Sequence, residues 1–78
     1  MGKFPVDAPK ARVIRSFEAL GFRVVRVGEH IAMRRGREGG SNLLTMPNHR
    51  ALKASTLRTI LTQAGISRED FLQVYEGS

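Results

Sequence analysis

Two histidines are the residues of this sequence best suited to proton transfer near neutral pH. His30 follows the dipeptide Gly28-Glu29, and His49 lies two residues after Pro47. An imidazole has an ordinary pKa near 6.5, so it can both accept and donate a proton at neutral pH. RNA offers a reaction that needs such a group, because its own 2′-hydroxyl attacks the neighbouring phosphate once that hydroxyl loses its proton. The leaving 5′-oxygen must then gain a proton, and a cation must neutralise the phosphorane.

Basic side chains accompany His30 in the N-terminal half of the chain. Residues 1–37 hold nine basic and three acidic groups, a net charge of +6, whereas residues 38–78 hold four of each. Seven of the nine are arginines, whose planar guanidinium binds phosphate in a bidentate fork. A polyanionic partner such as nucleic acid is the favoured interpretation, and charge that only maintains solubility is the alternative. The nine basic residues are Lys3, Lys10, Arg12, Arg15, Arg23, Arg26, Arg34, Arg35 and Arg37.

The sequence lacks the residues for several other kinds of site. There is no cysteine, there are two histidines, and the seven carboxylates are scattered, so no zinc or two-metal pattern is present. The GxxxxGK[ST] loop of nucleotide hydrolases is also missing. We therefore expect no metal, no nucleotide cofactor and no other cofactor. Ser41, Ser55 and Ser67 have no visible His/Asp constellation, and the last two are better explained as helix caps.

Apolar residues at helical spacing predict three helices. The first follows residues 7–9 and ends near Leu20. The second is capped by Ser55 and ends at Gly65, a residue type that favours helix C-termini. A last helix opens at Ser67.

Three short strands are expected between the first and second helices. Residues 22–27 and 30–35 form a hairpin around Gly28-Glu29, where glycine in the first central position predicts a two-residue type II′ turn. Residues 36–41 form a flexible turn, residues 42–46 form the third strand, and residues 48–54 form a polar loop. The expected fold is therefore α+β, with a three-stranded antiparallel sheet.

The turn sets which side chains share a face of the sheet. The register that it imposes pairs Arg23 with Arg34, Val25 with Ala32, and Val27 with His30. Cross-strand partners share a face, so His30 lies with Arg23 and Arg34 on the open face. We expect these two arginines to bind the phosphate beside His30. A one-residue slip would reverse this assignment. The opposite face is apolar and meets the helices through Phe22, Val24, Ile31 and Met33.

The order of these elements is the α-β-β-β-α architecture of double-stranded-RNA-binding domains, extended here by a C-terminal helix. At 78 residues, we expect residues 1–78 to form a single domain with its site on an open face or shallow groove. No apolar run approaches the roughly 18 residues of a membrane span, and no signal-peptide core opens the chain. Cytoplasmic localisation and no membrane partner are the expectations.

Each candidate residue also has a simpler explanation. His30 is either catalytic or a surface histidine in a strand. His49 is a possible second catalytic residue, with a loop histidine that shapes its turn as the favoured alternative. Lys53 is a candidate phosphate contact, although loop charges are usually only solvated.

Three segments resemble the motifs of a known family. Residues 21–30, GFRVVRVGEH, resemble its glycine-aromatic strand and Gly-Ser-His turn, and Met46-Pro47-Asn48-His49 resembles its Pro-x-His segment. Residues 55–66, STLRTILTQAGI, closely match its Gly-Thr-Leu-(basic)-x-Ile-Leu-x-Gln-Ala-Gly-Ile stretch. The motifs are those of the HicA-type mRNA interferase toxins, also called the YcfA-like family. The resemblance extends from about Pro9 to Phe71.

The resemblance implies a double-stranded-RNA-binding-like fold and a stress-response toxin that cleaves mRNA without a metal ion. It implies a HicB-type antitoxin that blocks the active face, and it places the catalytic histidine at His30. Two positions depart from the family pattern, Glu29 for the usual serine and Ser55 for the frequent glycine. A carboxylate at position 29 would hold the histidine proton more tightly and would repel an approaching phosphate.

Two other functions use the same basic face. One is a non-catalytic RNA-binding module, and the other is an interaction protein whose basic surface meets an acidic protein. The Gly-x-His turn favours the nuclease. The expected open strands carry no aromatic residues for stacking bases, which counts against a strong single-strand binder.

Overall fold

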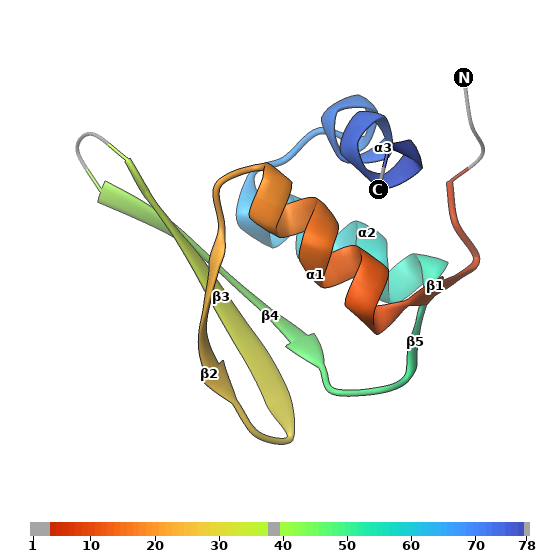
Figure 1. Ribbon diagram of the computed structural model, residues 1–78, viewed down its shortest axis with the longest axis horizontal. Helices are drawn as coiled ribbons and strands as arrows, with labels where there is room; N and C mark the ends of the chain where they lie inside the picture. The colour runs from red at the N-terminus through yellow and green to blue at the C-terminus, as the bar shows by residue number, and fades with distance from the viewer. Residues whose placement is uncertain (1–3, 38–39, 78) are drawn as a thin grey trace.

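The computed structural model describes residues 4–37 and 40–77, without the side chain of residue 37. Figure 1 shows helices α1 and α2 together on one side of a three-stranded sheet, with α3 near the far end of α1. None of the described helices has the length and apolar character needed to cross a bilayer. In chain order the elements are β1 (Asp7–Pro9), α1 (Lys10–Ala19), β2 (Arg23–Val27), β3 (His30–Arg37), β4 (Gly40–Pro47), β5 (Ala51–Lys53), α2 (Ala54–Ala64) and α3 (Arg68–Glu76).

The predicted α+β class and α-β-β-β-α layout are confirmed. Strands β2, β3 and β4 form an antiparallel sheet in that order, and α3 is the additional C-terminal helix. The third strand and its predecessor are longer than expected, because residues 36–37 and 40–41 continue the ladder between β3 and β4. Residues 38–39, which belong to the expected turn over residues 36–41, lie outside the described residues.

A second, two-stranded sheet was not predicted. Residues 7–9 pair antiparallel with residues 51–53. The first helix does follow residues 7–9, with Pro9 at its N-cap, but these residues also form a strand, and residues 51–53 are not an irregular loop. The pairing places Ala8 opposite Leu52, and both are buried in the core. Three-residue strands are too short for an alternating pattern to be visible in a sequence.

Of the two helix N-caps predicted from the sequence, one is confirmed and one is wrong. Ser67 caps α3, since its Oγ accepts a hydrogen bond of 3.1 Å from the backbone N–H of Asp70. The expected cap at Ser55 is wrong: Lys53 occupies the N-cap position of α2 and makes no side-chain cap bond. Strand β5 leads directly into the helix at Ala54, so Ser55 already lies in the first turn.

The hairpin register is correct at one end and wrong at the other. Arg23 does pair with Arg34, but the observed ladder then pairs Val24 with Met33, Arg26 with Ala32, and Val27 with Ile31. A β-bulge at Val25 causes the difference, since the bulge adds one unpaired residue to β2. The type II′ turn is also wrong, because it needs a positive φ at Gly28 and the described residues show positive φ only at Gly21, Gly40 and Gly65.

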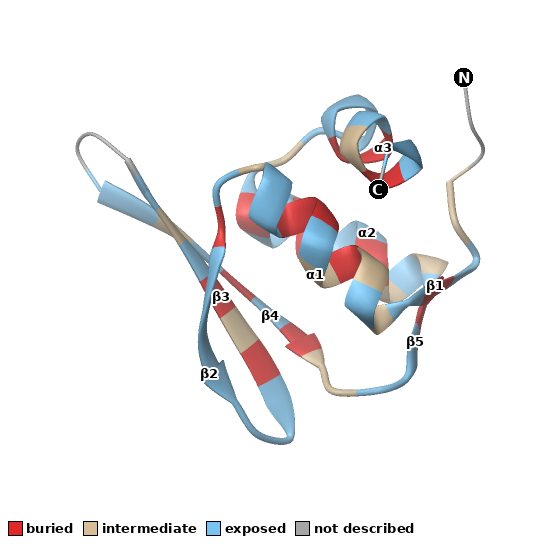
Figure 2. Ribbon diagram, in the orientation of Figure 1, coloured by how far each residue is buried: buried red, intermediate tan, exposed pale blue. Residues whose placement is uncertain are grey.

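One hydrophobic core lies between the helices and the inner face of the sheet, as the buried segments in Figure 2 show. Phe17 joins α1 to the residue just before β2 and to α3, because its ring lies 5.6 Å from that of Phe22 and 5.4 Å from that of Phe71. Ile31 and Met33 are buried as predicted, whereas Val24 remains 39% exposed. Val24 lies on β2, an edge strand that the helices cover incompletely.

Candidate active site

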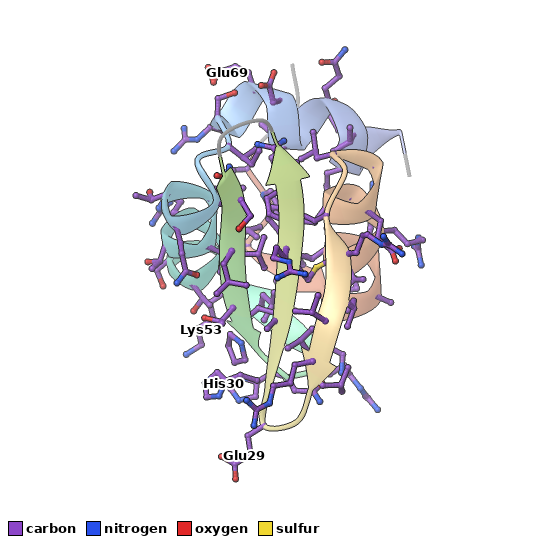
Figure 3. The ribbon with its side chains drawn as sticks, turned by 90° about the vertical axis from the view of Figure 1, so that its left-hand side faces the viewer. Glu29, His30, Lys53 and Glu69 are labelled. Carbon is purple, nitrogen blue, oxygen red and sulfur yellow. The ribbon has the colours of Figure 1, made fainter. Side chains whose placement is uncertain are left out.

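His30 is the first residue of β3 and lies at the exposed end of the sheet. It pairs with Pro47 of β4, and the alternation along β3 places it on the face opposite the buried Ile31 and Met33. Figure 3 shows His30 beside the hairpin turn on the sheet face turned toward the viewer. His30 is exposed, and no described residue donates a hydrogen bond to its ring or accepts one from it.

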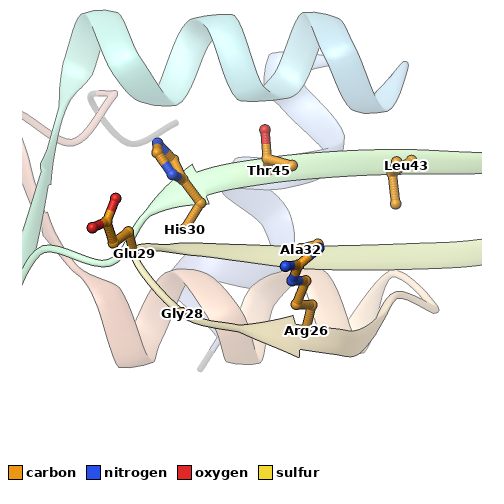
Figure 4. Close-up of a pocket in the computed structure, with 7 residues that line it drawn as sticks. All are labelled: Arg26, Gly28, Glu29, His30, Ala32, Leu43 and Thr45. Carbon is orange, nitrogen blue, oxygen red and sulfur yellow. The ribbon is translucent and has the colours of Figure 1, made fainter.

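An open cavity of ≈ 580 Å³ adjoins His30 on this face. Figure 4 shows His30 and Thr45 pointing in the same direction, while the Arg26 side chain extends from β2 toward Ala32 of β3. The cavity thus combines a proton-transfer group, a guanidinium and a hydroxyl. Its lining residues are Arg26, Gly28, Glu29, His30, Ala32, Leu43 and Thr45.

Arg26 is the site residue that the sequence reasoning missed. Residues 23 and 26 are three positions apart, which in a regular strand places them on opposite faces. The extra residue at Val25 shifts the alternation, so that Arg26 opposite Ala32 and Arg23 opposite Arg34 lie on the same face. The odd spacing of two arginines in an otherwise apolar strand was a signal for this bulge, because an unbulged strand would turn one guanidinium toward the core.

Arg23 and Arg34 lie on the predicted face but not in the His30 cavity. They are cross-strand partners and line a separate cavity of ≈ 360 Å³ with Val24, Val25 and Gly36. None of the described residues lines both cavities. The structure therefore brings Arg26, rather than Arg23 or Arg34, into the cavity of the histidine.

His49 and Lys53 line a third cavity, of ≈ 200 Å³. Pro47 also lines this cavity and is the strand partner of His30. Figure 3 shows Lys53 and His30 near the same end of the sheet. The two histidines thus belong to adjoining surfaces and do not line a common cavity. Across residues 4–37 and 40–77, no three His, Cys, Asp or Glu side chains gather in a way that could hold a metal ion.

Asn48 fastens the turn that carries the histidine. Its side-chain amide donates to the carbonyl of Gly28 at 2.9 Å, and its backbone N–H donates to the carbonyl of Glu29 at 3.1 Å. The Lys10 ammonium in turn donates to the side-chain oxygen of Asn48. These bonds connect the turn before His30 to the start of α1, and no sequence pattern had indicated them.

Glu29 is exposed at the tip of the turn (Figures 3 and 4). Among the described residues it forms no hydrogen bond or ion pair with His30. Its carboxylate does line the cavity, so the expected repulsion of an incoming phosphate has a structural basis.

Two arginines of the N-terminal half also stabilise the fold instead of facing a partner. The guanidinium of Arg12 donates to the carbonyl of Tyr75 at 2.9 and 3.1 Å and lies 4.1 Å from the centre of its ring. Arg35 donates to the carbonyl of Leu20 at 3.2 Å and lies over the ring of Phe22. The idea that the whole charge excess forms a phosphate-binding face is therefore too broad.

Comparison with known families supplies the identity. Residues 11–66, more than half of the chain, match the family model described as HicA toxin of bacterial toxin-antitoxin. The chain belongs to the HicA toxin family. No curated protein and no solved structure matches it. The matched region of this HicA chain contains Arg26, His30 and Asn48, and family membership implies a toxin role and an antitoxin partner.

Proposed function

We propose that this HicA-family toxin is a metal-independent endoribonuclease that cleaves mRNA, with His30 as its general acid/base. The observation that carries the proposal is the open cavity shared by His30 and Arg26. The reaction needs a titrating group and a fixed cation near one phosphate, and these two side chains supply them. The imidazole is exposed and has no protein partner among the described residues, so it is available to a substrate.

In the proposed reaction His30 removes the proton of the 2′-hydroxyl, and the 2′-oxygen attacks the adjacent phosphorus. The bond from phosphorus to the 5′-oxygen then breaks, and His30 returns the proton to that oxygen. Arg26 neutralises the charge of the phosphorane between these steps. The products carry a 2′,3′-cyclic phosphate and a 5′-hydroxyl.

The shape of the cavity supports a polymer as the substrate. The cavity lies along the surface of the sheet and is bounded by exposed side chains, so a strand can pass through it without a lid opening. Leu43 is 51% exposed in its wall and offers an apolar contact to a base. His49 and Lys53, in the adjoining cavity, are proposed as contacts to flanking RNA, with His49 as the second candidate for proton transfer.

The antitoxin is proposed to be of the HicB type and to cover this same face. Arg23, Arg26 and Arg34 are all exposed on it and have no carboxylate partner among the described residues. An acidic partner surface complements such a face and competes with RNA for it.

The test compares His30→Ala with His49→Ala on labelled RNA. General acid–base catalysis contributes about 10²–10⁴-fold in rate, so His30→Ala is expected to lose that factor while it retains its circular dichroism spectrum and most of its RNA affinity. His49→Ala is expected to lose less. An inactive His49→Ala beside an active His30→Ala would show that the wrong histidine has been assigned, and full activity in both would favour the non-catalytic RNA-binding module.

A further inference from the structure

The second cavity on the open face has the character of an anion site. Arg23 and Arg34 lie directly opposite each other on adjacent strands, an arrangement in which like charges destabilise a sheet. Both side chains are exposed, and neither has a hydrogen bond or an ion pair with another described residue. They line a cavity of ≈ 360 Å³ together with Val24, Val25 and Gly36. A bound phosphate would relieve the repulsion and accept hydrogen bonds from both guanidinium groups.

This cavity is separate from the His30 cavity but lies along the same line. His30 and Arg34 are both on β3, four residues apart, which is about 13 Å at the rise of a strand. Ala32 lies between them on the same face, with Arg26 as its partner. The open face therefore presents His30, then Arg26, then the Arg23–Arg34 pair, in one row. A single phosphate cannot occupy both ends of a row of this length, whereas successive phosphates of one strand can.

We propose that the Arg23–Arg34 cavity binds a second phosphate of the RNA strand whose scissile phosphate lies between His30 and Arg26. This inference rests on the proposed function and extends it to a substrate class, an RNA strand that continues beyond the dinucleotide at the cleaved bond. The scissile site carries out the reaction. The second cavity strengthens binding of the RNA and fixes which phosphate lies between His30 and Arg26.

The experiment uses RNA oligonucleotides with one cleavable bond, lengthened one nucleotide at a time on either side. Wild-type kcat/KM is expected to rise by about tenfold at the length at which the oligonucleotide first reaches the second cavity. A tenfold rise corresponds to the free energy of about one charge-assisted hydrogen bond. Arg23→Gln with Arg34→Gln is expected to lose this gain but to cleave the dinucleotide as well as wild type. The matched control is Arg15→Gln with Arg58→Gln, which removes the same charge from exposed helical positions outside the row and is expected to keep the gain. Cleavage that does not depend on length, or an equal loss in the control, would overturn the proposal.

Binding separates this inference from the proposed function. Binding of the longer oligonucleotide is measured with the His30→Ala protein at several salt concentrations. When Arg23 and Arg34 are also replaced, the slope of log affinity against log salt concentration is expected to become shallower by about 0.7. This is the value for one phosphate contact on a single strand. A fall of about 1.4 would mean that the arginines hold two phosphates and would contradict a shared site. Length-dependent binding in a wild-type protein that cleaves no RNA would refute the nuclease and leave the second site standing.

Discussion

Arg26 provides the sharpest test of how the bulge builds the site. Replacing it with glutamine removes the only guanidinium among the described residues that line the His30 cavity and leaves the sheet face polar. If Arg26 acts on the phosphorane, the loss falls mainly on kcat. If it only binds the ground-state phosphate, the loss falls mainly on KM.

The expected magnitude follows from the exposure of the site. Two unit charges about 4 Å apart interact by about 1 kcal/mol in bulk water and by about 4 kcal/mol at the effective dielectric constant of a protein surface. These limits correspond to about 5-fold and about 10³-fold in rate. Arg26 is exposed and its cavity is open, so solvent screening favours the lower half of this range. We expect Arg26→Gln to lower kcat by about 5- to 70-fold.

Single-turnover cleavage of a labelled oligonucleotide at saturating protein measures this loss directly. Arg15→Gln is the matched control, because Arg15 is exposed on α1 and has no partner among the described residues. It is expected to cleave like wild type. A normal single-turnover rate for Arg26→Gln, or an equal loss in Arg15→Gln, would refute the placement of Arg26 at the scissile phosphate.

Two further predictions concern the turn and the fold. Asn48→Ala removes the side-chain hydrogen bond to Gly28 and the acceptor for Lys10. Because His30 is then misplaced, kcat is expected to fall by about 10- to 100-fold while the circular dichroism spectrum stays unchanged. An unchanged kcat would show that the turn keeps its shape without the Asn48 side chain. Gly65→Ala places a Cβ on a residue with φ +71° at the end of α2. The substitution is expected to lower the free energy of unfolding by about 1 kcal/mol and Tm by about 4–8 °C. Cleavage below the unfolding temperature is expected to be retained. An unchanged Tm would contradict the strain assigned to this position.

The helices and the face of the sheet were predictable because their signals are local. The apolar stripe of α2 and its terminal Gly65 follow the helical period, and the Ser67 cap needs only a neighbour three residues away. Burial of Ile31 and Met33 follows from alternation along β3, which also places His30 on the open face.

The errors arose where the structure depends on pairing between distant segments. The period-two rule assumes an unbroken ladder, so it could not place Arg26 once Val25 formed a bulge. Strand β1 exists only because β5 pairs with it across the chain, and this pairing also displaced the expected Ser55 cap. The bonds from Asn48 to the His30 turn likewise join residues twenty positions apart, which no motif of either segment encodes.

The most direct test of the central claim is the chemistry of the RNA ends. Purified protein is incubated with labelled RNA in EDTA, and the products are compared with those of His30→Ala. The account predicts cleavage by the wild-type protein that persists in chelator, leaves 2′,3′-cyclic phosphate and 5′-hydroxyl ends, and falls by about 10²–10⁴-fold in His30→Ala. Cleavage that requires magnesium and leaves 5′-phosphate ends would contradict it.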